Sequence, residues 1–220
     1  MLKFFRNPVL LEKESIQRAM ESAAGYARGV LVDVGCGQKP YREIFTPYVT
    51  TYVGLDIDTE NAKSVDVCAN SLQLPVKSGA VDTVLSNQTI EHVTRPEALV
   101  AEVSRVLRPG GVFILTAPQL WCLHEKPHDY YRFTRYALDL LCREHGLEVL
   151  TLQERGGAFT AIGQMLSLMI YLPNAPHRWR LHASRPVFGL AQMAFRVLDR
   201  IFYNPDLTLG YLLVARKAAR

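Results

Sequence analysis

Residues 30–37, Val-Leu-Val-Asp-Val-Gly-Cys-Gly, decide the fold of this chain. The apolar run Val30–Val34 predicts a buried β-strand, and Gly35 and Gly37 predict a sharp turn directly after it. Glycine lets the backbone turn tightly and approach a ligand closely, because no Cβ is in the way. In an open α/β sheet such a turn faces the crevice at the carboxyl ends of the strands. The stretch therefore predicts the first strand of a ligand-binding sheet.

Further short apolar segments alternate with amphipathic ones along the rest of the chain. Seven strands are expected, and the helices between the first six indicate a mostly parallel sheet covered on both faces. The last strand follows two apolar helices and predicts a final antiparallel pair at the sheet edge. The expected strands are 30–34, 52–55, 65–69, 81–86, 112–116, 148–154 and 209–215, and the expected helices are 15–28, 96–107, 134–145, 158–171 and 186–202.

The same pattern predicts four segments. We expect an N-terminal helical segment over 1–29, a ligand-binding α/β core over 30–155, a helical lid or insertion over 156–205, and a closing strand of the core sheet over 206–220. A chain of 220 residues fits one α/β unit with an elaboration of this kind.

Composition excludes several classes of protein. With 49% hydrophobic and 21% charged residues the chain can bury a full core, which excludes disorder. A net charge of +4 is too small to indicate a nucleic-acid partner. Four scattered cysteines favour a reducing compartment, the N-terminus lacks the apolar core of a signal peptide, and the apolar run 158–172 is too short to span a bilayer. We expect a cytoplasmic protein, with peripheral contact to the inner membrane face left open.

Asp56 ends the second expected strand, 21 residues after Gly35. An acidic residue there accepts hydrogen bonds from both hydroxyls of a ribose and would repel a 2′-phosphate. A nicotinamide cofactor is the obvious alternative, but its fingerprint needs a small third glycine where this chain has Pro40. Asp33 also places a carboxylate beside the glycines, which suits a cationic ligand better than a pyrophosphate.

In order and spacing, these motifs resemble the class I S-adenosylmethionine-dependent methyltransferases, of Rossmann-like fold. The resemblance covers about residues 30–157, and its branch is one often associated with bacterial cell-surface glycan or lipid-linked pathways. The motifs that carry it are Val32–Gly37, Val53–Ile57, Leu74-Pro75, Val81–Val84, Ile90–Val93 and Arg105–Gly111.

The resemblance implies S-adenosyl-L-methionine as cofactor and a role for several residues. Gly35 and Gly37 would pass under its methionyl part, with Asp33 at its ammonium and Asp56 at its ribose. Asn70 stands where the family often has an aspartate that reaches the adenine amino group. The full set of expected cofactor-binding residues is Asp33, Gly35, Cys36, Gly37, Asp56, Ile57, Asn70, Ser71 and Asn87.

The loop 118–134, which follows the fifth strand, is the richest in functional side chains. Loops at the carboxyl ends of strands carry substrate chemistry. We expect His128 to be the general base, because its unperturbed pKa of about 6.5 leaves it largely neutral at pH 7. Asp129 or Tyr131 would orient His128 or bind the acceptor. The alternative is that Arg132 pairs with Asp129 structurally; Thr134 we expect to cap the following helix.

No metal site is expected from the sequence. His124, Glu125 and His128 do not have the spacing of a zincin motif, and Cys122, His124 and His128 lack a second pair of zinc ligands. Glu91-His92 resembles the metal-binding pair of quinone O-methyltransferases, but Gln88 replaces the further acid of that set.

We therefore expect a methyltransferase that acts on a small-molecule, glycan or lipid-linked acceptor, most simply at oxygen. The alternatives left open are a nicotinamide-dependent oxidoreductase and a non-catalytic cofactor-binding module. Segment 156–205 carries five arginines and one aspartate, and its 176–182 stretch, Pro-His-Arg-Trp-Arg-Leu-His, has the aromatic and basic character of a membrane-surface contact. One apolar face of the last helix would consist of Phe188, Ala191, Phe195, Leu198 and Phe202. The alternative to a membrane contact is that this face covers the sheet or forms a homodimer interface.

Overall fold

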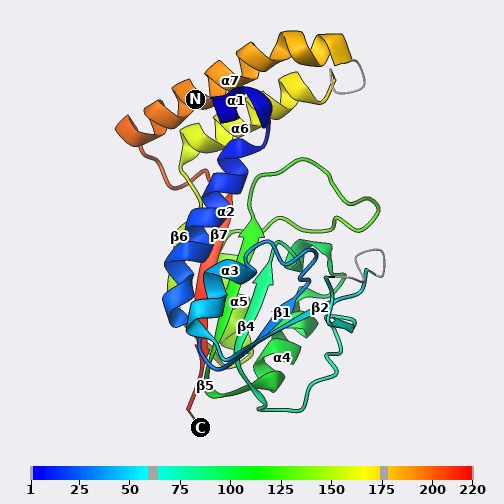
Figure 1. Cartoon of the computed structure of the whole chain (residues 1–220). Coiled ribbons are helices and arrows are strands. Elements are labelled where there is room, and N and C mark those ends of the chain that lie inside the picture. Colours follow the sequence, from blue (N-terminus) through cyan, green and yellow to red (C-terminus); the bar gives the residue numbers. More distant parts are fainter. Residues whose placement is uncertain (1, 59–63, 174–177, 220) are drawn as a thin grey trace. The chain divides into compact units, whose positions relative to one another are not determined.

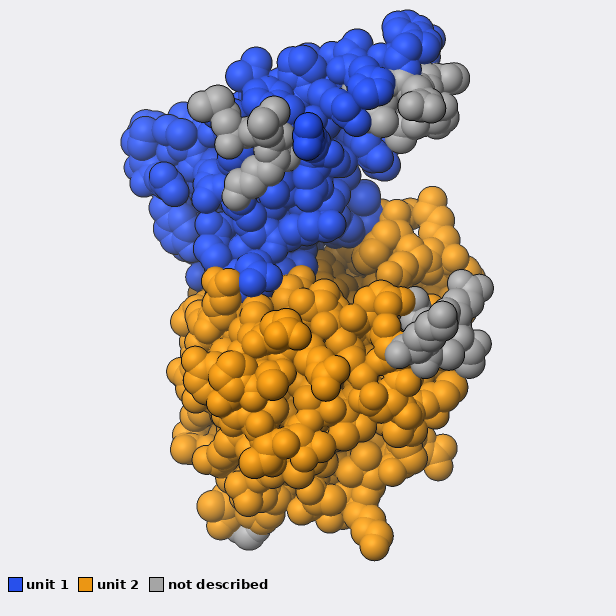
Figure 2. Space-filling model, viewed as in Figure 1, with its two compact units in different colours: residues 1–18, 119–122, 154–210 blue, residues 19–118, 123–153, 211–220 orange. Residues whose placement is uncertain are grey.

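A computed structural model of the chain describes residues 2–58, 64–173 and 178–219. The chain divides into two compact units, coloured separately in Figure 2. The larger unit contains residues 19–118, 123–153 and 211–220, and the smaller contains residues 1–18, 119–122 and 154–210. The N-terminal segment, which the sequence sets apart as 1–29, is therefore shared between the two units.

A seven-stranded sheet in the order β3-β2-β1-β4-β5-β7-β6 forms the centre of the larger unit. β1 pairs in parallel with β2 and β4, and β4 with β5, so the order reverses direction beside β1. The strands are β1 Val30–Val34, β2 Thr51–Asp56, β3 Val67–Cys68, β4 Val81–Asn87, β5 Leu107–Pro118, β6 Leu147–Glu154 and β7 Gly210–Lys217.

The last strand runs against its neighbours (Figure 1). The Arg155 amide donates to the Gly210 carbonyl and the Ala218 amide to the Gly146 carbonyl, so β6 and β7 pair antiparallel. The expected α/β Rossmann-like fold, with a mostly parallel seven-stranded sheet and one antiparallel strand, is confirmed.

Alternation along the strands buries both faces of the sheet. On one face, side chains such as Val84 and Phe113 pack with Leu99 of α4 (Pro96–Val106) and Leu138 of α5 (Arg135–Glu144). Leu31 and other strand residues are equally buried on the opposite face, where α3 (Arg42–Phe45) lies. Thr134 caps α5 by accepting from the Ala137 amide at 3.2 Å, as the sequence predicts. Short 3-10 helices, η1 Ala24–Tyr26, η2 Thr46–Tyr48 and η3 Ile90–His92, complete this unit.

The smaller unit is helical, with α1 Leu2–Arg6, the first half of α2 Leu10–Ala23, α6 Ala158–Tyr171 and α7 Arg178–Ile201. Two buried polar groups hold it together. The Arg155 guanidinium contacts the Glu12 carboxylate at 2.8 Å, and the Asp199 carboxylate of α7 caps α6. Among the described residues, no helix combines the length and apolar character needed to cross a bilayer.

Several expected elements have wrong bounds, and the strand expected over 112–116, for example, is Leu107–Pro118. The helix expected over 15–28 begins at Leu10, just after a turn in which Asn7 accepts from the Val9 amide, and it ends at Ala23. The strand expected over 65–69 is only Val67–Cys68. The last helix begins at Arg178, and Pro186, expected at its first position, lies inside it. Of the expected cluster 176–182, residues 176 and 177 lie outside the described residues.

Candidate functional site

The turn after β1 has the backbone conformation that its glycines permit. Gly35 and Gly37 have φ of +73° and +48°, in the left-handed region that favours glycine. A Cβ on Gly35 would lie 2.2 Å from the Thr89 hydroxyl oxygen, so no larger residue fits there. The Gly35 and Cys36 amides both donate to the Leu55 carbonyl, which fixes the turn against β2.

Asp56 is held at the end of β2 by two backbone amides. Its carboxylate accepts from Gly37 at 2.8 Å and from Asp58 at 3.0 Å. A carboxylate has lone pairs for about four hydrogen bonds, so two remain for hydroxyls of a ligand. The two amides therefore orient the Asp56 carboxylate and leave part of its hydrogen-bonding capacity for a ligand. Asp56 lines a cavity of about 530 Å³.

Asp33 lies on β1, buried, with 4% of its surface exposed. The Tyr52 hydroxyl donates to its carboxylate at 2.5 Å. Burial raises the pKa of Asp33 to about 7, and the Tyr52 hydrogen bond opposes that rise only in part. Asp33 does not line the 530 Å³ cavity.

The cavity gathers part of the expected cofactor-binding set. Gly35, Asp56, Ile57, Asn70 and Ser71 line it. The Asn70 side-chain oxygen accepts from the Leu72 amide at 2.9 Å and keeps one lone pair for a ligand.

Cys36, Gly37 and Asn87 lie outside the cavity lining. Cys36 is buried, and the Gly37 amide is the one that donates to Asp56. Asn87 accepts from the Thr116 hydroxyl at 2.6 Å, at the adjoining ends of β4 and β5.

His128 lines the same cavity, and its Nδ1 lies 2.9 Å from the Tyr130 hydroxyl. Tyr130 also lines the cavity, so the loop after β5 brings an imidazole and a phenol to the space that Asp56 enters. The sequence assigned the orienting role to Asp129 or Tyr131. In the structure the residue at the His128 ring is Tyr130.

In the structure, Asp129 and Tyr131 form hydrogen bonds that hold the loop after β5 in place. The Asp129 carboxylate forms two hydrogen bonds with the Arg132 guanidinium, at 2.7 and 2.8 Å, and accepts from the His124 amide at 3.0 Å. The Arg132 bond is the main reason that the pKa of Asp129 is lowered. The Tyr131 hydroxyl donates to the Thr94 carbonyl at 3.1 Å. Neither residue lines the cavity.

The sequence missed several residues of the cavity wall, among them Thr89, His92, Thr94, Glu125 and Tyr130. His92 belongs to the Ile90–Val93 motif, which supports the family resemblance, and the Glu91-His92 pair was otherwise weighed as a metal-binding pair. Tyr130 stands between two residues that were selected. To select the missed residues, one would need to know the path of the loop, and the sequence pattern does not give that path.

A family model described as "Methyltransferase domain" matches residues 32–115. An uncharacterized methyltransferase of Mycolicibacterium vanbaalenii is 32% identical over 142 residues, 57% of this chain and 55% of that protein. A probable S-adenosylmethionine-dependent methyltransferase of Mycolicibacterium smegmatis is 34% identical over 110 residues, 46% of this chain and 42% of that protein. The chain thus spans about half the length of these curated relatives.

Among solved structures, a geranyl diphosphate methyltransferase in complex with S-adenosylmethionine superimposes with a TM-score of 0.61 at 17% identity. The superposition covers 93% of this chain and 86% of the geranyl diphosphate methyltransferase chain. At that identity the likeness shows the fold alone. Residues 32–115 match the methyltransferase-domain model, and the relatives support the class I, S-adenosylmethionine-dependent kind, with S-adenosylmethionine as the cofactor. The comparisons do not favour a nicotinamide-dependent oxidoreductase.

The residues present fit this cofactor. The cavity volume lies in the range of small-molecule sites, about 300–1,000 Å³. Asp56 and Gly35 both line the cavity, and Asp56 offers its carboxylate to a ribose.

Proposed function

We propose that this chain transfers a methyl group from S-adenosylmethionine to an oxygen of a small-molecule, glycan or lipid-linked acceptor. The observation that carries the proposal is one cavity lined both by Asp56, Asn70 and Ser71 and by His128 and Tyr130. The first three residues suit the nucleoside of the cofactor. The last two come from the loop after β5 and suit an acceptor.

The cofactor supplies a methyl group already activated on a sulfonium, so the chain has to position the acceptor and remove its proton. His128 is the residue we assign to that proton. For this role Nδ1 carries a hydrogen and donates it to the Tyr130 hydroxyl oxygen, 2.9 Å away, which leaves Nε2 with a free lone pair. Nε2 then accepts the proton of the acceptor hydroxyl as the oxygen attacks.

Asp129 and Tyr131 remain part of this proposal as residues that position the loop. Asp129 is ionised and paired with Arg132, so it is poorly suited to accept a further proton. Its contact with the His124 amide instead fixes the start of the segment that carries His128 and Tyr130.

The acceptor assignment is tested with methyl-labelled cofactor and extracts of bacterial glycans and lipids. His128→Ala should lower turnover by roughly 10²–10⁴ while S-adenosylmethionine affinity is unchanged. His145→Ala, a histidine of α5's C-terminal end, is the matched control and should keep full turnover. Full turnover in His128→Ala would remove His128 from the proton transfer.

We further propose that α7 contacts an anionic membrane surface, where a lipid-linked acceptor would be found. The expected apolar face of this helix is largely covered within the smaller unit, where Phe188 is buried and Phe195 packs on Phe159. A second apolar stripe on the same helix is exposed: Trp179, Val187, Leu190, Val197 and Ile201 are each between 53% and 70% exposed.

These five residues recur at spacings that place them on one side of a helix, and exposed Arg180 and Arg200 accompany them. An apolar stripe with arginines beside it is typical of a helix that lies in the membrane interface. Arg196 is not available for this role, because it pairs with Glu14.

Sedimentation with anionic vesicles at low salt tests the membrane contact. We expect wild type to sediment and Leu190→Ser/Val197→Ser to sediment much less, while Leu140→Ser, an exposed leucine of α5, behaves as wild type. A wild-type protein that ignores the vesicles contradicts the contact. If the same double variant converts a dimer into a monomer in light scattering, the stripe is a homodimer interface instead.

A further inference from the structure

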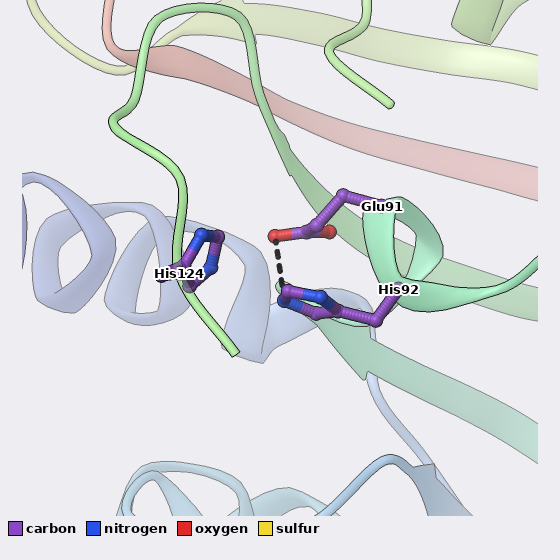
Figure 3. A group of neighbouring side chains, drawn as sticks. All are labelled: Glu91, His92 and His124. Carbon is purple, nitrogen blue, oxygen red and sulfur yellow. Dashed lines mark ion pairs between the residues drawn. The ribbon is translucent and has the colours of Figure 1, made fainter. Parts of the chain in front are cut away.

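Glu91, His92 and His124 bring three metal-ligand side chains together beside the cavity. One potential ligand atom from each residue lies within 4.8 Å of the others. Figure 3 shows the Glu91 carboxylate directed toward the two imidazole rings, which come from η3 and from the loop after β5. The rings meet edge to face, with centroids 4.6 Å apart.

The Glu91 side chain is fully buried, with 0% of its surface exposed. Its nearest oxygen is 3.9 Å from His92 Nε2. Positive charge beside a buried carboxylate offsets part of its desolvation cost. A divalent cation between the carboxylate and two imidazoles would provide that charge.

The orientation of His92 suits a metal ligand. Its Nδ1 lies 2.6 Å from the His128 carbonyl oxygen, which can only accept, so Nδ1 carries the hydrogen. Nε2 of the neutral ring then has its lone pair on the side of Glu91. Histidines that bind metals commonly donate their other ring N–H to a carbonyl or carboxylate in this way.

His124 is positioned by the Asp129–Arg132 pair. Its amide donates to Asp129, and its Nδ1 lies 3.3 Å from the same carboxylate. The loop is further tied to η3, because the Tyr130 amide donates to the Glu91 carbonyl at 2.9 Å. Backbone bonds and a buried ion pair therefore hold residues from two distant segments at one point.

We propose that Glu91, His92 and His124 bind one divalent transition-metal ion, of which Zn²⁺ is the best fit. Two imidazoles and a carboxylate are a common ligand set for zinc. Ligand atoms around zinc lie roughly 3.4 Å apart, so each side chain would move by less than about 1 Å to close the site. The ion would cross-link η3 to the loop that carries His128.

Glu125 is the nearest candidate for a fourth ligand. Its carboxylate is 3.7 Å from His92 Nε2 and its side chain is 71% exposed, so its position is free to change. Both Glu125 and His92 line the cavity, which places the proposed ion at the cavity wall. The sequence could not indicate this site, because it had no reason to join His124 to the Glu91-His92 pair.

The test is direct metal binding by untagged, metal-stripped protein without S-adenosylmethionine, so its outcome is independent of methyl transfer. Calorimetry with Zn²⁺ alone should show one ion per chain. The Co²⁺ form should show visible absorption bands, which report the ligand set. Elemental analysis after dialysis gives the stoichiometry a second time.

His124→Ala and Glu91→Gln should each weaken Zn²⁺ binding at least tenfold and alter the Co²⁺ spectrum, whereas His145→Ala should do neither. Circular dichroism identifies a variant that fails to fold, and His124→Asn then replaces His124→Ala. The proposal is overturned if wild type takes up less than one ion per chain, or if folded His124 and Glu91 variants bind as wild type does.

Discussion

Asp33 and Asp56 are two carboxylates of neighbouring strands with opposite surroundings. Asp56 accepts two backbone amides and reaches the cavity, whereas Asp33 is buried and bonded to the Tyr52 hydroxyl. The local environment therefore suits Asp56 to bind ligand hydroxyls directly, and makes the charge of Asp33 depend on pH.

Asp56→Ala should reduce S-adenosylmethionine affinity at least tenfold. The change removes one or two charge-assisted hydrogen bonds to the ribose, each worth about 1.5–3 kcal/mol. Calorimetry measures the loss, and Asp56→Asn, which keeps one acceptor, should lose less. Asp139→Ala on α5 is the control. Unchanged affinity in a folded Asp56→Ala variant would remove Asp56 from the site.

Asp33→Asn should stabilise the ligand-free protein more at pH 8 than at pH 5. The pKa of Asp33 is about 7 in the folded chain, against 3.8 for an ordinary aspartate, so the contribution of Asp33 to folding stability is lost as pH rises toward 7. Asparagine stays neutral, and one pKa unit is worth about 1.4 kcal/mol, so the gain over wild type should grow by about 2–3 kcal/mol between the two pH values. Urea unfolding at both pH values measures it. Equal differences at pH 5 and pH 8 would contradict the raised pKa.

At the scale of elements, the sequence predicted the strands better than the helix ends. Each buried strand is a short apolar run followed by turn residues, and this signal is local. Pro186 predicts a helix start, where proline is common, whereas α7 continues through it and Phe188 just beyond it is buried. Before α2, Asn7 accepts from the Val9 amide, and a single asparagine among mostly apolar residues is a weak signal of a helix start.

The candidate site divides in the same way. Gly35, Asp56, Asn70 and Ser71 follow strands directly and could be predicted from spacing. Tyr130, His92 and His124 could not, because their positions depend on how an irregular loop returns across η3. The hydrogen bond from the Tyr130 amide to the Glu91 carbonyl, which guides this return, joins residues far apart in the sequence.

α6 should depend on a cap supplied by another helix. Gly157 precedes it and has no side chain to cap it, and Asp199 of α7 accepts from the Gly157 amide, the Thr160 amide and the Thr160 hydroxyl. Asp199→Ala should therefore destabilise the protein by about 1–3 kcal/mol. Denaturant unfolding checks the value, and hydrogen exchange should rise first in α6. Asp206→Ala, an exposed aspartate, should have little effect, and an equal loss in both variants would contradict the cap.

At the scale of the whole molecule, the two units contain the residues of different proposals. The larger holds the seven-stranded sheet and every residue of the cavity, and the smaller holds the exposed stripe of α7. The proposed membrane contact therefore rests on residues separate from those of methyl transfer and metal binding, and each of the three proposals has a test of its own.

The central claim is that this chain uses S-adenosylmethionine to methylate an acceptor. The most direct measurement is the release of adenosylhomocysteine, quantified by mass spectrometry, when the protein and S-adenosylmethionine are incubated with bacterial glycan and lipid extracts. We predict release by wild type in step with a methylated product, and at least tenfold less by Asp56→Ala at limiting cofactor. Release no greater than that of Asp56→Ala with every extract, from a folded wild-type protein, would contradict the claim.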